Sequence, residues 1–127
     1  IALDPGTGKA RWEFDPKVER GGKRGFRCRG VSYWRSPGPE DEAACRHRIF
    51  LATHDRRLVA LDAKTGQPCA DFGVQGIVAL AEHGKYKPGE VTSSSAPAVA
   101  NGVVVVGSSV VDFEYSEAPR GVVTTAL

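Results

Sequence analysis

Short apolar runs, separated by glycine, proline and polar residues, form the dominant pattern of this sequence. Alternation of apolar and polar residues is typical of a half-buried strand, and a continuous β-branched run is typical of a strand buried on both faces. The valine run 103–106 is of the continuous kind, so we expect both its faces to be buried. Residues 77–82 show neither pattern and predict a short helical or irregular segment. Strands are predicted in or near segments 1–3, 12–14, 31–34, 48–53, 57–62, 103–106, 110–113 and 122–123.

Turn residues join these strands at short intervals. Fifteen glycines and eight prolines in 127 residues favour many turns over long helices. The string Asp4-Pro5-Gly6-Thr7-Gly8 predicts a hairpin turn, since proline presets φ at turn entry and glycine tolerates positive φ. Asn101-Gly102 is a strong short hairpin signal. We therefore predict an all-β chain of about eight strands, arranged as consecutive four-stranded units.

One heptapeptide pattern occurs twice. Residues 2–8 read Ala-Leu-Asp-Pro-Gly-Thr-Gly, and residues 60–66 read Ala-Leu-Asp-Ala-Lys-Thr-Gly, beginning 58 residues later. Repeats on this scale mark propellers or solenoids. Trp12 follows the first copy, whereas Ala70 stands at the matching place after the second. We predict two blade regions, 1–69 with the hairpin repeat and 70–127 following it.

Composition and charge exclude several classes of protein. With 41% apolar and 25% charged residues, the chain has the composition of an ordinary globular domain. The net charge of +2 is small, so we predict no nucleic-acid partner despite a basic stretch at 17–35. No apolar run approaches the roughly 20 residues of a membrane span. The three cysteines lack the close paired spacing of a zinc site, leaving open one disulfide with a leftover thiol, or unpaired thiols.

Three segments resemble one family, the dehydrogenases that depend on pyrroloquinoline quinone (PQQ). Ala2, Asp4, Gly8 and Trp12 resemble its tryptophan-docking motif, in which the tryptophan stacks between adjacent blades. Residues 28–34 (CRGVSYW) resemble the membrane-bound glucose/quinate/shikimate branch, and 94–113 followed by Arg120-Gly121 resembles a third family segment. The resemblance implies roughly two blades of an eight-bladed β-propeller. At 127 residues the chain is then expected to be a fragment of the whole enzyme.

The resemblance also assigns site residues. It implies that Arg29, Ser94 and Ser109 bind PQQ, whose three carboxylates suit the rigid, charged donor fork of an arginine. Asp112 matches the acidic position that ligates a divalent ion in alcohol dehydrogenase relatives, and calcium or magnesium takes such oxygen ligands. Trp34 stands where glucose-oxidising relatives often have a histidine implicated in substrate selection, which implies a place in the substrate pocket. The catalytic base is implied to lie in later blades, outside this chain.

The resemblance implies an enzyme as the full-length parent. It would oxidise a sugar, polyol or cyclic polyol acid and pass electrons through PQQ to a respiratory quinone, in the periplasm at the inner membrane. Membrane association would come from segments outside this chain, and the chain alone would be inactive. The alternative is a non-enzymatic propeller scaffold of the outer-membrane assembly type, which has the same repeat but no PQQ. The CRGVSYW string and residues 109–112 favour the enzyme, because a scaffold needs only the repeat.

Overall fold

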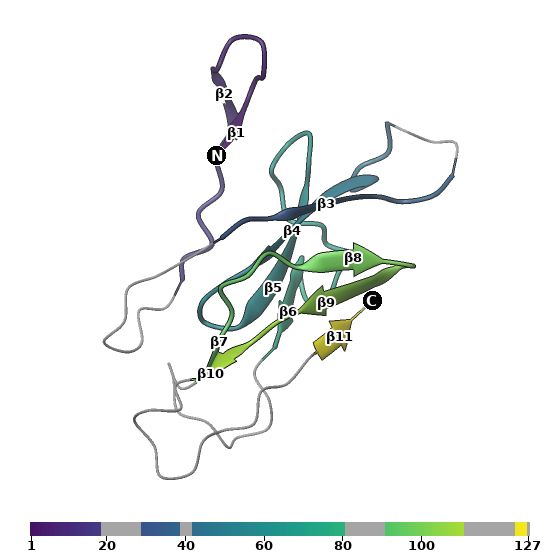
Figure 1. Ribbon diagram of the computed structural model, residues 1–127. Coiled ribbons are helices and arrows are strands. Elements are labelled where there is room, and N and C mark those ends of the chain that lie inside the picture. Colours follow the sequence, from purple (N-terminus) through teal and green to yellow (C-terminus); the bar gives the residue numbers. More distant parts are fainter. Residues whose placement is uncertain (19–28, 39–41, 81–90, 111–123, 127) are drawn as a thin grey trace.

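A computed structural model of the chain describes residues 1–18, 29–38, 42–80, 91–110 and 124–126 (Figure 1). These residues form strands and no helix, which confirms the predicted all-β fold. Accordingly, no helix in the described part is long and apolar enough to cross a membrane. The strands are β1 (Ala2–Leu3), β2 (Ala10–Trp12), β3 (Ser32–Arg35), β4 (His47–Ala52), β5 (Arg57–Asp62), β6 (Ile77–Ala79), β7 (Val91–Thr92), β8 (Ala98–Ala100), β9 (Val103–Val106), β10 (Ser109–Val110) and β11 (Thr124–Ala126).

The largest sheet is an antiparallel meander with the strand order β3-β4-β5-β6. Its central hairpin is closed at Thr53, whose hydroxyl accepts the N–H of Arg57 at 3.0 Å. The sheet includes β6, so the prediction of a helical or irregular segment is wrong for Ile77–Ala79. Three residues are too few to display alternation, and pairing with β5 makes them a strand. The predicted boundary between blade regions, after residue 69, falls between β5 and β6.

A second layer is formed by the three-stranded sheet β11-β9-β8 and the strand pair β10-β7. Asn101 and Gly102 join β8 to β9 with φ values of 50° and 75°, the positive pair that a tight hairpin requires. In β9, Val104 and Val106 are buried, but Val103 and Val105 are each 36% exposed. The expected burial on both faces is therefore wrong for the described chain, in which only one face of β9 packs against other residues.

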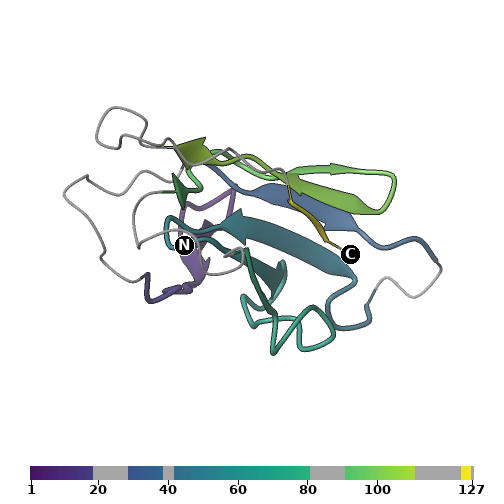
Figure 2. The same ribbon diagram turned by 90° about the horizontal axis from the view of Figure 1, so that it is seen from below.

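The hydrophobic core lies between these two layers, which Figures 1 and 2 show from two directions. Phe50 and Leu58 of the large sheet are fully buried, as is Val104 of β9. Phe50 also meets Phe72 edge-on, with ring centroids 5.4 Å apart. Burying each such side chain contributes roughly 1.5–3 kcal/mol, so the packing between the sheets stabilises the described chain.

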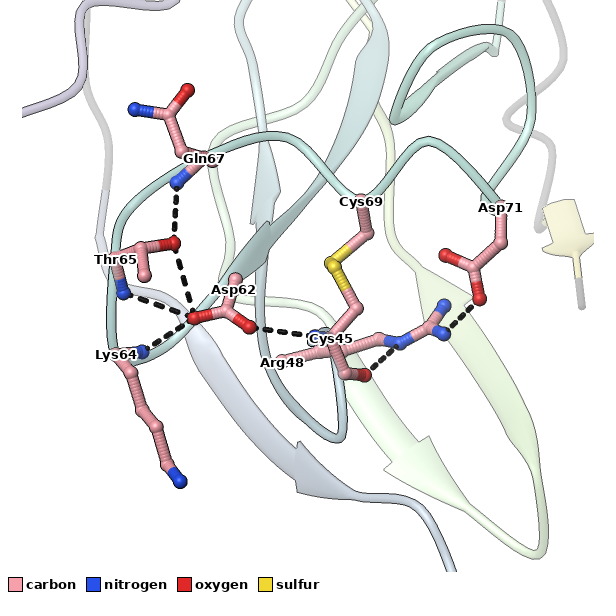
Figure 3. Close-up of a disulfide and its surroundings, with 8 residues drawn as sticks. All are labelled: Cys45, Arg48, Asp62, Lys64, Thr65, Gln67, Cys69 and Asp71. Atoms are coloured by element: carbon pink, nitrogen blue, oxygen red, sulfur yellow. Dashed lines mark hydrogen bonds and ion pairs between the residues drawn. A yellow bond between two sulfur atoms is a disulfide. The ribbon is translucent and has the colours of Figure 1, made fainter. Parts of the chain in front are cut away.

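A disulfide joins the two ends of the β4–β5 hairpin (Figure 3). Cys45 precedes β4 and Cys69 follows β5, with their Cα atoms 5.7 Å apart. One of the two alternatives left open by the sequence is thus realised, while Cys28 lies outside the described residues. The ligand atoms of Cys45, Cys69 and Asp71 lie within 4.8 Å of one another. Because the two sulfurs are bonded to each other, the group offers no thiolate to a metal ion.

Candidate functional site

Two residues implied in cofactor binding, Arg29 and Ser94, are neighbours in the structure. The backbone N–H of Arg29 donates a hydrogen bond to the carbonyl oxygen of Ser94 at 3.0 Å. Three residues further along both segments, the Ser32 hydroxyl donates to the carbonyl oxygen of Pro97. The segment leading into β3 therefore runs alongside the segment leading into β8, and the two strands are themselves in contact.

Ser109 belongs to the same region of the fold. It opens β10, where it pairs with Thr92 of β7, two residues before Ser94. Arg29, Ser94 and Ser109 thus come from three adjacent backbone segments. Arg29 and Ser109 are exposed and Ser94 is half-buried, so all three residues are accessible in the described chain.

The donors of this group suit an anionic ligand. Within the described residues, no carboxylate pairs with the Arg29 guanidinium, and no hydrogen bond engages the hydroxyl of Ser94 or Ser109. One guanidinium and two hydroxyls, with no acidic side chain among them, form a set of donors for carboxylate oxygens. The residues present therefore fit PQQ, which carries three carboxylates.

Trp34 packs against the hydrophobic core and forms a cation–π contact with Arg48. It lies half-buried in β3, packs against the core, and pairs across the sheet with Arg48, whose guanidinium lies 5.7 Å from the ring centroid. Arg48 is fixed in turn, since its Nε donates to the Cys45 carbonyl at 2.8 Å and its guanidinium pairs with Asp71 (Figure 3). The place of Trp34 in a substrate pocket stays a prediction. Asp112, the predicted metal ligand, lies outside the described residues.

Trp12 connects the two copies of the repeat. Its indole Nε1–H donates to the carbonyl oxygen of Ala63 at 3.1 Å, inside the turn of the second copy. The ring lies directly on Gly66, where an added Cβ would be only 2.5 Å from an indole carbon. The tryptophan that follows the first copy thus docks on the glycine turn of the second. The stacking between adjacent blades that the resemblance implies stays a prediction.

Sequence reasoning missed the residues that fasten Arg29 to its neighbours. Gly30 follows Arg29 directly in the CRGVSYW string and Ser32 stands three residues after Arg29. Position within that string is the only signal that pointed to them. Their roles depend on contacts with residues 96 and 97, more than sixty positions away. A single sequence does not show such tertiary contacts.

Comparison with known proteins identifies the class of protein to which this fold and site belong. A family model described as "PQQ: Glucose/ethanol/alcohol dehydrogenase, beta-propeller domain" matches residues 1–125. The chain belongs to this family, and its sheets are part of a β-propeller domain. The resemblance inferred from the three sequence segments is confirmed.

Individual relatives are quinoprotein dehydrogenases. The chain is 36% identical to quinoprotein glucose dehydrogenase A of Acinetobacter calcoaceticus, over 97% of this chain and 17% of that protein. It is 40% identical to the glycerol dehydrogenase large subunit of Gluconobacter oxydans and 35% identical to the quinate/shikimate dehydrogenase (quinone) of Acinetobacter baylyi, with the same two coverages. The chain therefore spans about a sixth of the length of these relatives. They give no support to the scaffold alternative.

Proposed function

We propose that this chain forms the PQQ-binding part of the propeller in a dehydrogenase that oxidises a sugar, polyol or cyclic polyol acid. The observation that carries the proposal is the hydrogen bond between the Arg29 N–H and the Ser94 carbonyl, which brings two implied ligands together from distant segments. The substrate class rests on the names of the relatives, which act on glucose, glycerol and quinate or shikimate.

Each residue has a defined task in this proposal. Bound PQQ supplies the ortho-quinone that accepts two electrons from the alcohol. Arg29 binds a cofactor carboxylate through its charged fork, and Ser94 and Ser109 donate their hydroxyls to further oxygens. Arg29 can form two parallel charged hydrogen bonds to one carboxylate, whereas each serine offers a single neutral donor, so Arg29 is expected to be the strongest contributor of the three.

The divalent ion and the electron acceptor extend the same proposal. Asp112 follows Ser109 by three residues and offers a carboxylate, a ligand type that calcium and magnesium prefer. Such an ion next to the cofactor would polarise a quinone carbonyl. A respiratory quinone would take the electrons onward, through segments of the protein outside this chain that also provide membrane association.

The disulfide supports a periplasmic location for the protein. Disulfides form and persist in oxidising compartments such as the bacterial periplasm, and they are rare in the cytosol. Cys69 is fully buried, so the Cys45–Cys69 bond is part of the packed core. We therefore propose a periplasmic location for the dehydrogenase; its attachment to the inner membrane belongs to the same proposal but rests on the family resemblance and not on the disulfide.

Replacement of Arg29 tests the proposal. In the intact dehydrogenase, Arg29→Ala should raise the Kd for PQQ about 10- to 100-fold, because one charged hydrogen-bonding group is lost. The measurement is a PQQ titration followed by absorbance, with dye-linked oxidation of glucose, glycerol and quinate alongside it. The matched control is Arg11→Ala, since Arg11 is also exposed but pairs with Asp4 in the β1–β2 hairpin. An unchanged Kd in Arg29→Ala would contradict the proposal.

A further inference from the structure

The segments carrying Arg29 and Ser94 are fastened to each other at two points. The first is the backbone hydrogen bond from Arg29 to Ser94, and the second is the hydrogen bond from the Ser32 hydroxyl to the Pro97 carbonyl. Ser32 lies three residues after Arg29, and Pro97 lies three residues after Ser94, so the two segments run parallel and in register. The second point is the one that depends on a side chain.

Ser32 is itself anchored on the core. It is the first residue of β3 and pairs across the sheet with Phe50, which is fully buried. Its backbone is thus fixed in the large sheet, while its hydroxyl reaches the segment that leads into β8 of the other sheet. Pro97, which accepts this hydrogen bond, is buried and Ser32 is half-buried, so the contact is partly shielded from competing water.

Gly30 fixes the backbone between Arg29 and Ser32 through its conformation. Its φ of 149° lies in a region that other residues rarely adopt. On the side that faces Ala96 there is room for no more than ordinary van der Waals contact, since an added Cβ would lie 3.4 Å from the Cβ of Ala96. Only two residues separate Arg29 from Ser32, so the position of one backbone is closely tied to that of the other.

We propose that Ser32 is a positioning residue for the cofactor: its hydroxyl, bonded to Pro97, holds the Arg29 guanidinium in register with Ser94 across the boundary between the two sheets. This inference rests on the proposed function, because it gives Ser32 a role only through the PQQ ligand Arg29. Without the hydroxyl, only the Arg29–Ser94 backbone hydrogen bond of this pair would join the two segments. The guanidinium would then sample positions that do not suit a bound carboxylate.

The test uses Ser32→Ala and Ser32→Thr in the intact dehydrogenase. Ser32→Ala should raise the Kd for PQQ about 5- to 10-fold, because the Arg29 guanidinium would no longer be held in place before PQQ binds. The melting temperature of the PQQ-free protein should also fall modestly, since one internal hydrogen bond is lost. Ser32→Thr retains the hydroxyl and should restore the wild-type Kd within about twofold. The matched control is Ser36→Ala just beyond the other end of β3, where the backbone N–H rather than the hydroxyl bonds to Arg46.

A double variant separates positioning from general stability. If Ser32 acts through Arg29, adding Ser32→Ala to Arg29→Ala should cause almost no further change in the Kd. The inference is overturned if the two effects multiply independently, or if Ser32→Ala lowers the melting temperature without changing the Kd. If Arg29→Ala weakens PQQ binding and Ser32→Ala does not, the proposed function stands and the role of Ser32 falls. If Arg29→Ala itself leaves the Kd unchanged, the proposed function fails first.

Discussion

The two copies of the repeat form the same turn from the aspartate, threonine and glycine that they share. In each, one carboxylate oxygen of the aspartate accepts two backbone N–H groups and a threonine hydroxyl, at Asp4 in the first copy and at Asp62 in the second. The closing glycines, Gly8 and Gly66, have φ values of 69° and 74°. Local sequence therefore determines local structure in both copies, and differences between them must arise from their surroundings.

The second carboxylate oxygen shows how far the surroundings differ. At Asp4 it accepts from the exposed side chain of Arg11 at 2.6 Å, and this contact is the main reason that the pKa of Asp4 falls to about 2. At Asp62, which is buried, it accepts the backbone N–H of Cys45 at 2.6 Å. Burial raises the pKa of Asp62, but the N–H groups from Cys45, Thr65 and Lys64 together lower it below its ordinary value.

The two closing glycines also differ in whether another side chain covers them. Trp12 covers Gly66, whereas a Cβ at Gly8 would meet no described atom within 4 Å. The second turn is further tied by the disulfide, since Cys45 bonds both to Asp62 and to Cys69. One sequence pattern thus gives an exposed hairpin turn in one place and a turn covered by Trp12 in the other. The additional stabilising contacts, from Trp12 and from the disulfide, are made at the second copy.

Among the changes that test this difference between the two copies, removing the disulfide should lower the stability of the protein most. The bond closes a loop with a sequence separation of 24 residues, for which the expected contribution is about 3 kcal/mol. The double variant Cys45→Ser/Cys69→Ser should therefore melt well below the wild-type dehydrogenase, as measured by calorimetry. Reductant should lower the wild-type melting temperature and leave the double variant unaffected. Equal melting temperatures for wild type and variant would show that the second copy does not depend on this bond.

Much of the fold was predictable because it follows from local rules. The strands β4 and β5 were predicted at 48–53 and 57–62, within one residue of their observed ends, and the Asn101-Gly102 turn was also placed correctly, since short apolar runs and turn chemistry depend on adjacent residues. Two features failed for physical reasons. β6 is defined by its pairing with β5 and not by its own pattern, and the exposed face of β9 depends on what packs against it.

The candidate site was predictable only in part. Arg29 and Ser94 were named from the family resemblance, but their hydrogen bond joins residues 65 positions apart and no local pattern encodes it. The same holds for the pairing of Cys45 with Cys69, which results from the antiparallel pairing of β4 and β5. Ser32 carries no unusual chemistry of its own, so its contact with Pro97 emerged only from the structure.

Replacing the glycine of each turn by alanine should distinguish the cost of a side chain at positive φ from the cost of a clash with Trp12. Gly66→Ala and Gly8→Ala both place a side chain at positive φ, a cost of roughly 1 kcal/mol that is common to the two variants. In Gly66→Ala the new Cβ also collides with the indole of Trp12, and such overpacking costs about 1–3 kcal/mol more. Calorimetry should therefore show a clearly larger drop in melting temperature for Gly66→Ala.

Trp12 provides the control for that pair of variants. In a Trp12→Ala background the indole is absent, so Gly66→Ala and Gly8→Ala should become nearly equivalent. A persistent difference between them would mean that something other than Trp12 restricts Gly66.

The smallest effect is expected at the exposed turn, as a dependence on pH. The pKa of Asp4 is about 2 in the folded chain and 3.8 in the unfolded chain. A depressed folded-state pKa means that the contribution of Asp4 to stability is complete above pH 3.8 and is lost as the pH falls through about 2.

Carboxyl NMR of ¹³C-aspartate-labelled protein should show Asp4 titrating near pH 2, with Asp4→Asn used to assign its signal. In Arg11→Gln the pKa should move up towards 3.8, because the guanidinium is the largest cause of the shift. An Asp4 resonance that titrates near 3.8 in the wild type would show that the Arg11 pair has no influence in solution, as is common for exposed ion pairs.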